Sequence, residues 1–154
     1  METTMATPAA ASSIARIYGT FTSLLDKSQP LFALAMRLYV AKVFIVSGWL
    51  KFSRWDSTLA LFENEYHVPL LSPQTAAVLG TTAELALPLL FALGIRSRVV
   101  ALALFVFNIV AVISYPDLSP AGLKDHVFWG ALMLVIAFYG PGRFSVDRLL
   151  FGSR

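Results

Sequence analysis

The sequence contains no cysteine, and this absence excludes several kinds of chemistry. Disulfides, thiol nucleophiles, CxxC redox centres and thiolate-bound metals cannot come from this chain. It also lacks a phosphate-binding loop, a hydrolase nucleophile elbow, a dinucleotide fingerprint and any metal-ligand spacing. Nothing in it indicates a nucleic-acid partner. With no self-contained catalytic motif, the sequence leaves open whether the chain is an enzyme.

Charge is scarce too, at 14% of the 154 residues, whereas 57% are hydrophobic. A soluble domain has about a quarter charged residues. The apolar residues gather in four runs at residues 31–52, 74–93, 97–115 and 123–139, and a helix of about 20 residues spans a bilayer. The sequence therefore predicts an all-α bundle of four transmembrane helices at residues 30–142, with the lipid bilayer as its partner.

The segments outside these runs differ in character. Residues 1–12 are small and polar and are expected to be disordered. Residues 13–29 have an apolar stripe at helical spacing, which predicts a short amphipathic helix on the membrane surface; the alternative is a helix packed on protein loops. Pro30 is expected to begin the first span. The outer loop 53–73 is expected to hold a short helix across the mouth of the bundle, and residues 143–154 to form a cytoplasmic surface tail.

Lysine and arginine are unevenly divided between the two sides of the predicted bundle. With four spans, both termini share a side with the turn at residues 94–97. This side has seven cations: Arg16, Lys27, Arg96, Arg98, Arg143, Arg148 and Arg154. The other side has Arg54 and Lys124, with Lys51 at its rim. The positive-inside rule then predicts that both termini are cytoplasmic.

Three ionisable residues fall well inside predicted spans: Arg37 and Lys42 in the first and Glu84 in the second. A charge at the bilayer centre costs at least about 2.5–3.5 kcal/mol, so paired charges are expected. Glu84 is expected to pair with Arg37, Lys42 or both, and Arg37 is the preferred partner, because a guanidinium can bind a carboxylate through two hydrogen bonds. Lys42 lies off the Arg37 stripe, and is expected to face a helix groove or a partner subunit, as in a homodimer.

Two further polar residues lie in the third and fourth runs. Asn108 is typical of a hydrogen bond between membrane helices. His126, expected in the first turn of the fourth span, could serve as a proton relay or a haem ligand. A lone histidine argues against haem ligation, and no metal site is expected.

Three stretches together resemble the DoxX family of small four-helix membrane proteins. The first is "MRLYVAKVFIVSGWLKF", with Arg37, Gly48 and Lys51, and the second is "AELALPLLFALGIRSR", with Glu84. The third is "YGPGRFSVDRLL", whose motif positions are Gly140, Pro141, Gly142, Arg143, Ser145 and Asp147. The resemblance extends over residues 31–150.

The resemblance implies a protein of the bacterial inner (plasma) membrane, associated with oxidoreductases. It would bind a quinone-like molecule or a partner oxidoreductase through a buried Arg/Glu site. The alternative is a non-enzymatic scaffold, or a small-molecule or proton carrier, whose buried charges are structural. The buried polar candidates are Arg37, Lys42, Lys51, Glu84, Asn108 and His126. No catalytic residue follows from the resemblance, and no cofactor is identified beyond a quinone as one option.

Overall fold

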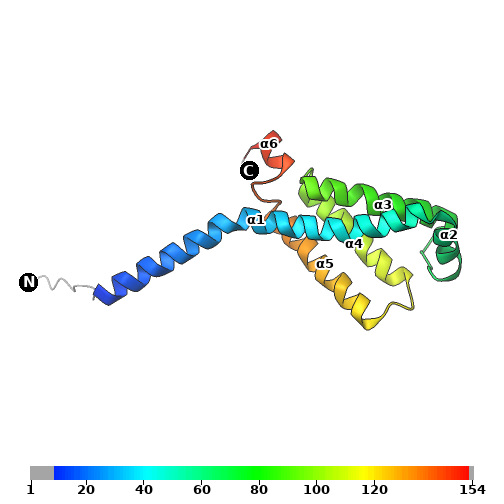
Figure 1. The fold of residues 1–154 in the computed structure, drawn as a ribbon, viewed down its shortest axis with the longest axis horizontal. Helices are drawn as coiled ribbons and strands as arrows, with labels where there is room; N and C mark the ends of the chain where they lie inside the picture. Colours follow the sequence, from blue (N-terminus) through cyan, green and yellow to red (C-terminus); the bar gives the residue numbers. More distant parts are fainter. Residues whose placement is uncertain (1–8, 153–154) are drawn as a thin grey trace, which may run out of the picture.

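The computed structural model describes residues 9–152, and within them every regular element is a helix. The six helices are α1 (Ala9–Ser53), α2 (Trp55–Asn64), α3 (Pro73–Leu93), α4 (Ser97–Ser114), α5 (Pro120–Tyr139) and α6 (Val146–Phe151) (Figure 1). Four of them, α1, α3, α4 and α5, are long and apolar enough to cross a membrane. The predicted all-α four-helix membrane bundle is confirmed.

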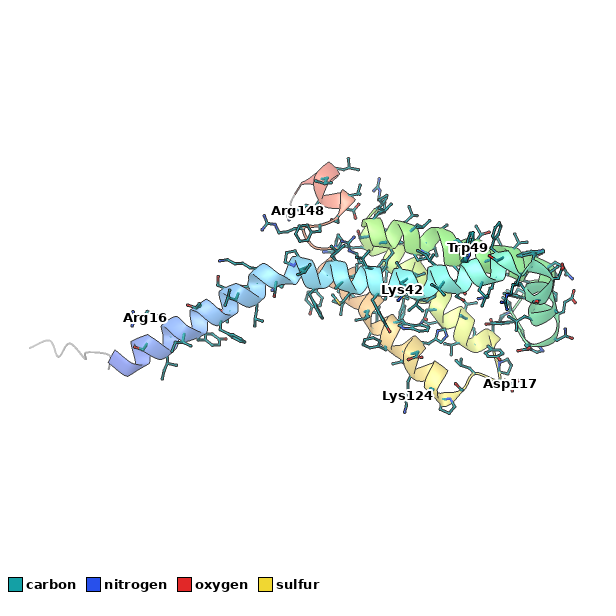
Figure 2. All side chains as sticks on the ribbon, viewed as in Figure 1. Arg16, Lys42, Trp49, Asp117, Lys124 and Arg148 are labelled. Carbon is teal, nitrogen blue, oxygen red and sulfur yellow. The ribbon has the colours of Figure 1, made fainter. Side chains whose placement is uncertain are left out.

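The bundle has two distinct ends. Helix α2 and the α4–α5 loop lie at one end, and α6 lies at the other, close to the α3–α4 turn (Figure 1). Figure 2 shows the same division, with Asp117 and Lys124 far from Arg148. We call these the α2 end and the α6 end.

Helices α1 and α3 pack most extensively on each other, and α4 packs mainly on α5. Contacts between α3 and α4 and between α1 and α5 close the bundle. The core between the four helices is apolar. Its large buried side chains include Val40, Phe44, Phe91, Leu104, Met133 and Ile136.

Local signals set most helix boundaries. Ser72 and Ser119 cap α3 and α5, because their hydroxyl groups accept hydrogen bonds from the N–H of Thr75 (3.3 Å) and Gly122 (3.1 Å). A proline follows each cap at the first helical position, which suits its missing N–H. Helix α5 therefore begins at Pro120, earlier than the predicted residue 123. Gly94 ends α3 in the left-handed conformation, with φ of 72°.

Helix α1 differs from the expected two-part arrangement. It runs without a break from Ala9 to Ser53, with Pro30 inside it, and its first half projects away from the bundle (Figure 1). The expectation that a new helix begins at Pro30 was wrong. An internal proline removes one backbone hydrogen bond, and the good helix formers around it keep the segment helical.

The N-terminal predictions are met only in part. Of the predicted disordered tail, residues 1–8 lie outside the described residues, and 9–12 are helical. The apolar stripe at residues 14–25 is exposed along the projecting half of α1. Its placement on a membrane surface stays a prediction.

The outer loop forms the expected short helix. Helix α2 packs against the start of α3, where Phe62 lies over Gly80 and beside the buried Ala76 and Ala77. Tyr66 stacks between the rings of Phe62 and Tyr115. Burial, followed by the nearby Glu84, raises the pKa of Tyr66 to about 12. The backbone N–H of His67 also donates to the carbonyl of Ser114 at 2.7 Å. The loop is therefore fixed on both α3 and α4.

Candidate functional site

A buried ion pair joins α1 and α3 beneath α2. Lys51 Nζ lies 2.7 Å from both Glu84 Oε1 and Glu84 Oε2, and it donates to Ser47 Oγ at 2.9 Å. The Ser47 hydroxyl in turn donates to Glu84 Oε1 at 3.3 Å. The side chains of Lys51 and Glu84 are only 13% and 10% exposed. Each charge is therefore neutralised within a closed three-residue network.

Close packing at Gly48 sets the register that brings these groups together. A Cβ at Gly48 would lie 2.9 Å from Glu84 Cβ, so only glycine allows α1 to approach α3 so closely here. Lys51 follows one turn later, on the α2 side of this contact. Arg37 precedes Gly48 by 11 residues, which is about 16 Å along a helix. The predicted pairing of Arg37 with Glu84 was therefore wrong, because the register places Lys51 opposite the carboxylate.

Arg37 is completely buried at the other end of the bundle. Its Nη1 donates to the carbonyl of Ala92 at 2.9 Å, and its Nη2 donates to the carbonyl of Phe144. Ala92 lies in the last turn of α3, whose carbonyls lack helical partners and carry partial negative charge. Arg37 thus joins α1 to the end of α3 and to the C-terminal tail.

The tail motif is fastened at the same place. Asp147 accepts hydrogen bonds from the backbone N–H groups of Arg96 and Ser97, both at 2.7 Å, and from Ser97 Oγ at 2.8 Å. Burial by itself would raise the pKa of Asp147, but the hydrogen bonds from Ser97 and Arg96 outweigh it and hold that pKa below its ordinary value. The carboxylate thereby caps α4 from a distant part of the chain. Helix α6 has a different cap, Ser145, whose hydroxyl oxygen accepts a hydrogen bond from the backbone N–H of Arg148.

The motif glycines and proline make this tail compact. A Cβ at Gly94 would lie 2.4 Å from Arg37 Nη1 and 2.5 Å from Ser145 Cβ, so a larger residue would push the tail away. Gly142 also packs closely, because a Cβ at this position would lie 3.0 Å from Ala33 Cβ. Gly140 and Pro141 turn the chain out of α5, and Arg143 is exposed. Gly94, together with the motif residues Gly140, Pro141 and Gly142, thus forms a structural joint at the α6 end.

Asn108 and His126 form a second polar contact, between α4 and α5. Asn108 Nδ2 donates to the backbone carbonyl of His126 at 3.0 Å, and Asn108 Oδ1 lies 2.7 Å from His126 Nδ1. The His126 ring also meets Trp129 edge-on, with ring centroids 4.8 Å apart. Because α5 begins at Pro120, His126 lies in its second turn and not its first. The expected bond between helices is present.

Lys42 is not buried. Its side chain is exposed on α1 midway along the bundle, so its inclusion among the buried polar candidates was wrong. Lys42 and Lys51 are nine residues apart, which rotates them to different faces of the helix. Contact of Lys42 with a second copy of the chain stays a prediction.

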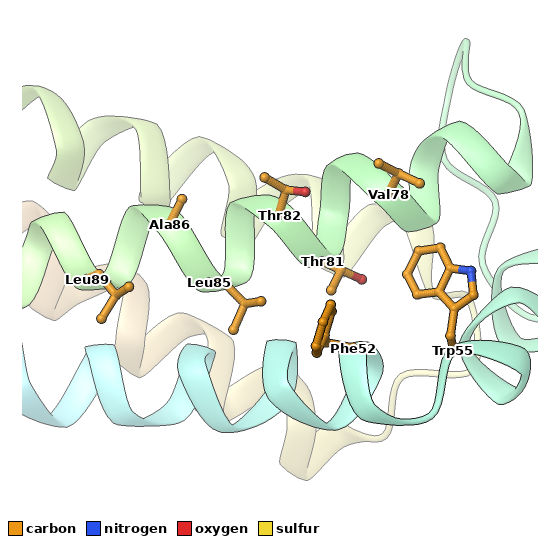
Figure 3. Close-up of a pocket in the computed structure, with 8 residues that line it drawn as sticks. All are labelled: Phe52, Trp55, Val78, Thr81, Thr82, Leu85, Ala86 and Leu89. Atoms are coloured by element: carbon orange, nitrogen blue, oxygen red, sulfur yellow. The ribbon is translucent and has the colours of Figure 1, made fainter.

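A groove opens on the outer side of the bundle, next to the ion pair. It has a volume of about 610 Å³ and is lined by Phe52, Trp55, Val78, Thr81, Thr82, Leu85, Ala86 and Leu89 (Figure 3). Phe52 and Trp55 face α3 across it (Figure 3). Thr81 Oγ1 is buried and has no hydrogen-bond partner in the described part of the chain. The groove is thus mainly apolar, with the buried hydroxyl of Thr81 and the exposed Thr82 in its wall.

Sequence reasoning missed Ser47, Thr81 and Ser97 as members of these sites. The pairing of Lys51 with Glu84 had one usable signal, since Gly48 marks a close approach of two helices, three residues before Lys51. Among residues 9–152, no group of three or more His, Asp or Glu side chains could hold a metal ion.

The fold and its buried polar groups define an integral membrane protein built on one four-helix bundle. The DoxX family profile matches residues 32–116, more than half of the chain, and the chain belongs to this family. The tail motif at residues 140–147 lies outside the matched region.

The chain is also similar to Inner membrane protein YphA from Escherichia coli (strain K12). The two are 29% identical over 132 residues, which cover 79% of this chain and 91% of the relative. No solved structure matches the chain.

Proposed function

We propose that this chain is a redox-associated subunit of the inner membrane that binds a quinone-like molecule in the groove between α1 and α3. The groove carries the proposal, because it combines an apolar volume of about 610 Å³ with aromatic walls and an unpaired hydroxyl. Small-molecule sites have about this size and this balance of apolar and polar groups. The similarity to an inner membrane protein supports the location.

The groove residues suit a flat ring with polar edges. Phe52 and Trp55 can pack against such a ring, and the hydroxyl of the exposed Thr82 can donate to a carbonyl oxygen or accept from a hydroxyl. Most of the lining residues are exposed on the outer surface of the bundle, so a hydrophobic ligand could enter from the lipid. The predicted buried Arg/Glu site is thus replaced by the groove, with Lys51 and Glu84 as its buried neighbours.

Electron transfer by this chain would require a bound cofactor or a partner protein. The chain contains no cysteine, so electrons would pass through a bound cofactor or a partner oxidoreductase. Lys51 and Glu84 would keep the walls of the groove in register, because they join α1 to α3 beside Phe52 and Thr81.

A specific observation supports the alternative, a scaffold or a small-molecule or proton carrier. Glu84 and Lys51 satisfy each other, and the Nη groups of Arg37 bind backbone carbonyls. Such closed networks also occur as purely structural contacts between membrane helices.

Binding of decylubiquinone to the purified full-length chain tests the proposal. Saturable quenching of tryptophan fluorescence is expected, because Trp55 lines the groove. Ala86→Phe should fill the groove and abolish the quenching. Ala103→Phe is the matched control, since Ala103 is exposed on α4, away from the groove. Thr82→Val should weaken binding roughly fivefold, the effect of losing one hydrogen bond.

Two results would count against a quinone site: quenching that does not saturate, and Ala86→Phe binding like the unmodified chain. Complementation of a deletion strain by a well-folded Ala86→Phe variant would favour the scaffold or carrier.

A further inference from the structure

A second groove lies at the α6 end, separate from the one between α1 and α3. Its volume is about 890 Å³, and its walls come from α1, the start of α4, the end of α5 and the tail from Gly140 to Gly152. It therefore lies where the chain leaves the apolar part of the bundle.

The rim of this groove is basic. Four arginines line it, Arg96, Arg98, Arg143 and Arg148, against the two acids Asp26 and Asp147, a balance of 4 − 2 = +2. Asp147 is already bound by the first N–H groups of α4. Within residues 9–152, the guanidinium groups of Arg143 and Arg148 make no hydrogen bond or ion pair. Two cations are therefore free to bind an anion.

Arg98 is held in place at the same rim. Its Nη1 donates to the carbonyl of Phe138 at 3.0 Å, at the end of α5. Gly140 has no side chain to cover the rest of the guanidinium, and a Cβ there would lie 3.6 Å from Nη2 and 3.9 Å from Nε. No side chain at Gly140 therefore covers the N–H groups at Nη2 and Nε of Arg98.

The floor of the groove is apolar. Ala33, Met36 and Ile136 are buried there, and Phe32 and Val135 continue the lining onto the exposed surface of the spans. An apolar floor offers no binding energy to a small soluble anion. A phospholipid carries both a phosphate for the basic rim and acyl chains that can pack on the apolar floor. Basic pockets between membrane helices are known to bind anionic headgroups.

We propose that this groove binds one anionic phospholipid, with its phosphate at Arg98, Arg143 and Arg148 and its acyl chains along Phe32 and Val135. The site is distinct from the proposed quinone groove. It requires no particular orientation in the membrane, and it would survive failure of the quinone proposal.

Native mass spectrometry of the detergent-solubilised full chain tests this site by titration with dioleoylphosphatidylglycerol. One lipid should bind saturably, and more tightly than dioleoylphosphatidylcholine. The double variant Arg143→Gln/Arg148→Gln should weaken phosphatidylglycerol binding roughly 25-fold, about fivefold for each lost cation. Arg143→Lys/Arg148→Lys should retain most of the affinity, because each lysine keeps the charge. Neither pair should disturb folding, since both guanidinium groups lack partners within the described residues.

The matched control is Arg16→Gln/Lys27→Gln, which removes two cations from the same end but outside the groove. It should leave the affinity nearly unchanged. Equal weakening in the control would overturn the proposal in favour of diffuse surface charge. Equal binding of the two lipids would also overturn it, and so would competition by glycerol 3-phosphate at the same concentration as the lipid, because that would indicate a site for a soluble phosphate.

Discussion

The partner of Glu84 is decided by the contacts of single residues. Arg37 and Lys51 were both available cations on α1, and Arg37 has the better chemistry for a carboxylate. The contact of Gly48 with Glu84 fixes the register and makes Lys51 the partner. The sequence correctly indicated that Glu84 pairs with a cation of the first span, but it pointed to the wrong cation, because depth along a helix does not give the offset between two helices.

Breaking the Lys51–Glu84 pair should destabilise the bundle. Lys51→Met or Glu84→Gln alone should lower the free energy of unfolding by about 3–5 kcal/mol, because each leaves a buried group without its partner. The double variant Lys51→Met/Glu84→Gln should cost less than the sum of the two single changes. Reversible unfolding in mixed detergent micelles measures these values.

Lys42→Met provides the control for this cycle, since Lys42 is an exposed lysine on the same helix. It should cause no comparable loss of stability. Additive single effects, or a loss at Lys42 as large as at Lys51, would contradict the assigned pair.

At the scale of elements, the C-terminal tail acts as a cap for α4. Serine and aspartate at the start of a helix usually cap that same helix, so local rules would assign both Ser145 and Asp147 to α6. Ser145 does cap α6, but Asp147 reaches the first N–H groups of α4 instead. A local motif could not reveal this, because about 50 residues separate the carboxylate from the helix that it caps.

Asp147→Asn should loosen the joint between the tail and α4. Loss of a helix cap costs about 1 kcal/mol, so amide hydrogen exchange at residues 94–97 and 143–150 should speed up roughly fivefold at neutral pH. Asp125→Asn, an exposed aspartate at the α2 end, should leave these amides unchanged. Equal exchange in the two variants would show that the cap has no energetic role.

The same contact sets a pH dependence. The folded pKa of Asp147 lies below its ordinary value of 3.8. The stabilisation is therefore fully present above pH 3.8 and is lost as the pH falls through the folded pKa. In the unmodified chain, exchange at residues 94–97, corrected for its intrinsic pH dependence, should rise below that value. In Asp147→Asn this rise should be absent.

Helix α1 shows another limit of local signals. Pro30 is a sound predictor of a helix start, yet the helix continues through it. The apolar stripe before Pro30 was correctly predicted to be helical, and only its connection to the span was misjudged. Proline restrains the backbone without deciding whether a helix resumes on its other side.

At the scale of the whole molecule, orientation remains a prediction from the uneven distribution of cations. Because the chain has no cysteine, each introduced cysteine can be labelled without background. In intact spheroplasts, an impermeant maleimide should label Asp117→Cys and should spare Ser23→Cys until the membrane is permeabilised. The opposite pattern would place both termini outside. Labelling of neither variant after permeabilisation would show that these positions are buried in an assembly.

The amino-acid sequence was sufficient to predict the four spans, the helical outer loop, most helix ends and the family. These follow from apolar run length, capping residues and local motifs, which act over a few turns of helix. Three further outcomes became visible in the folded chain: Lys51 pairs with Glu84, Arg37 and Asp147 bind the tail to the α3–α4 turn, and Lys42 faces outward. Those outcomes depend on helix rotation and register, which packing across the whole bundle sets and no single segment encodes.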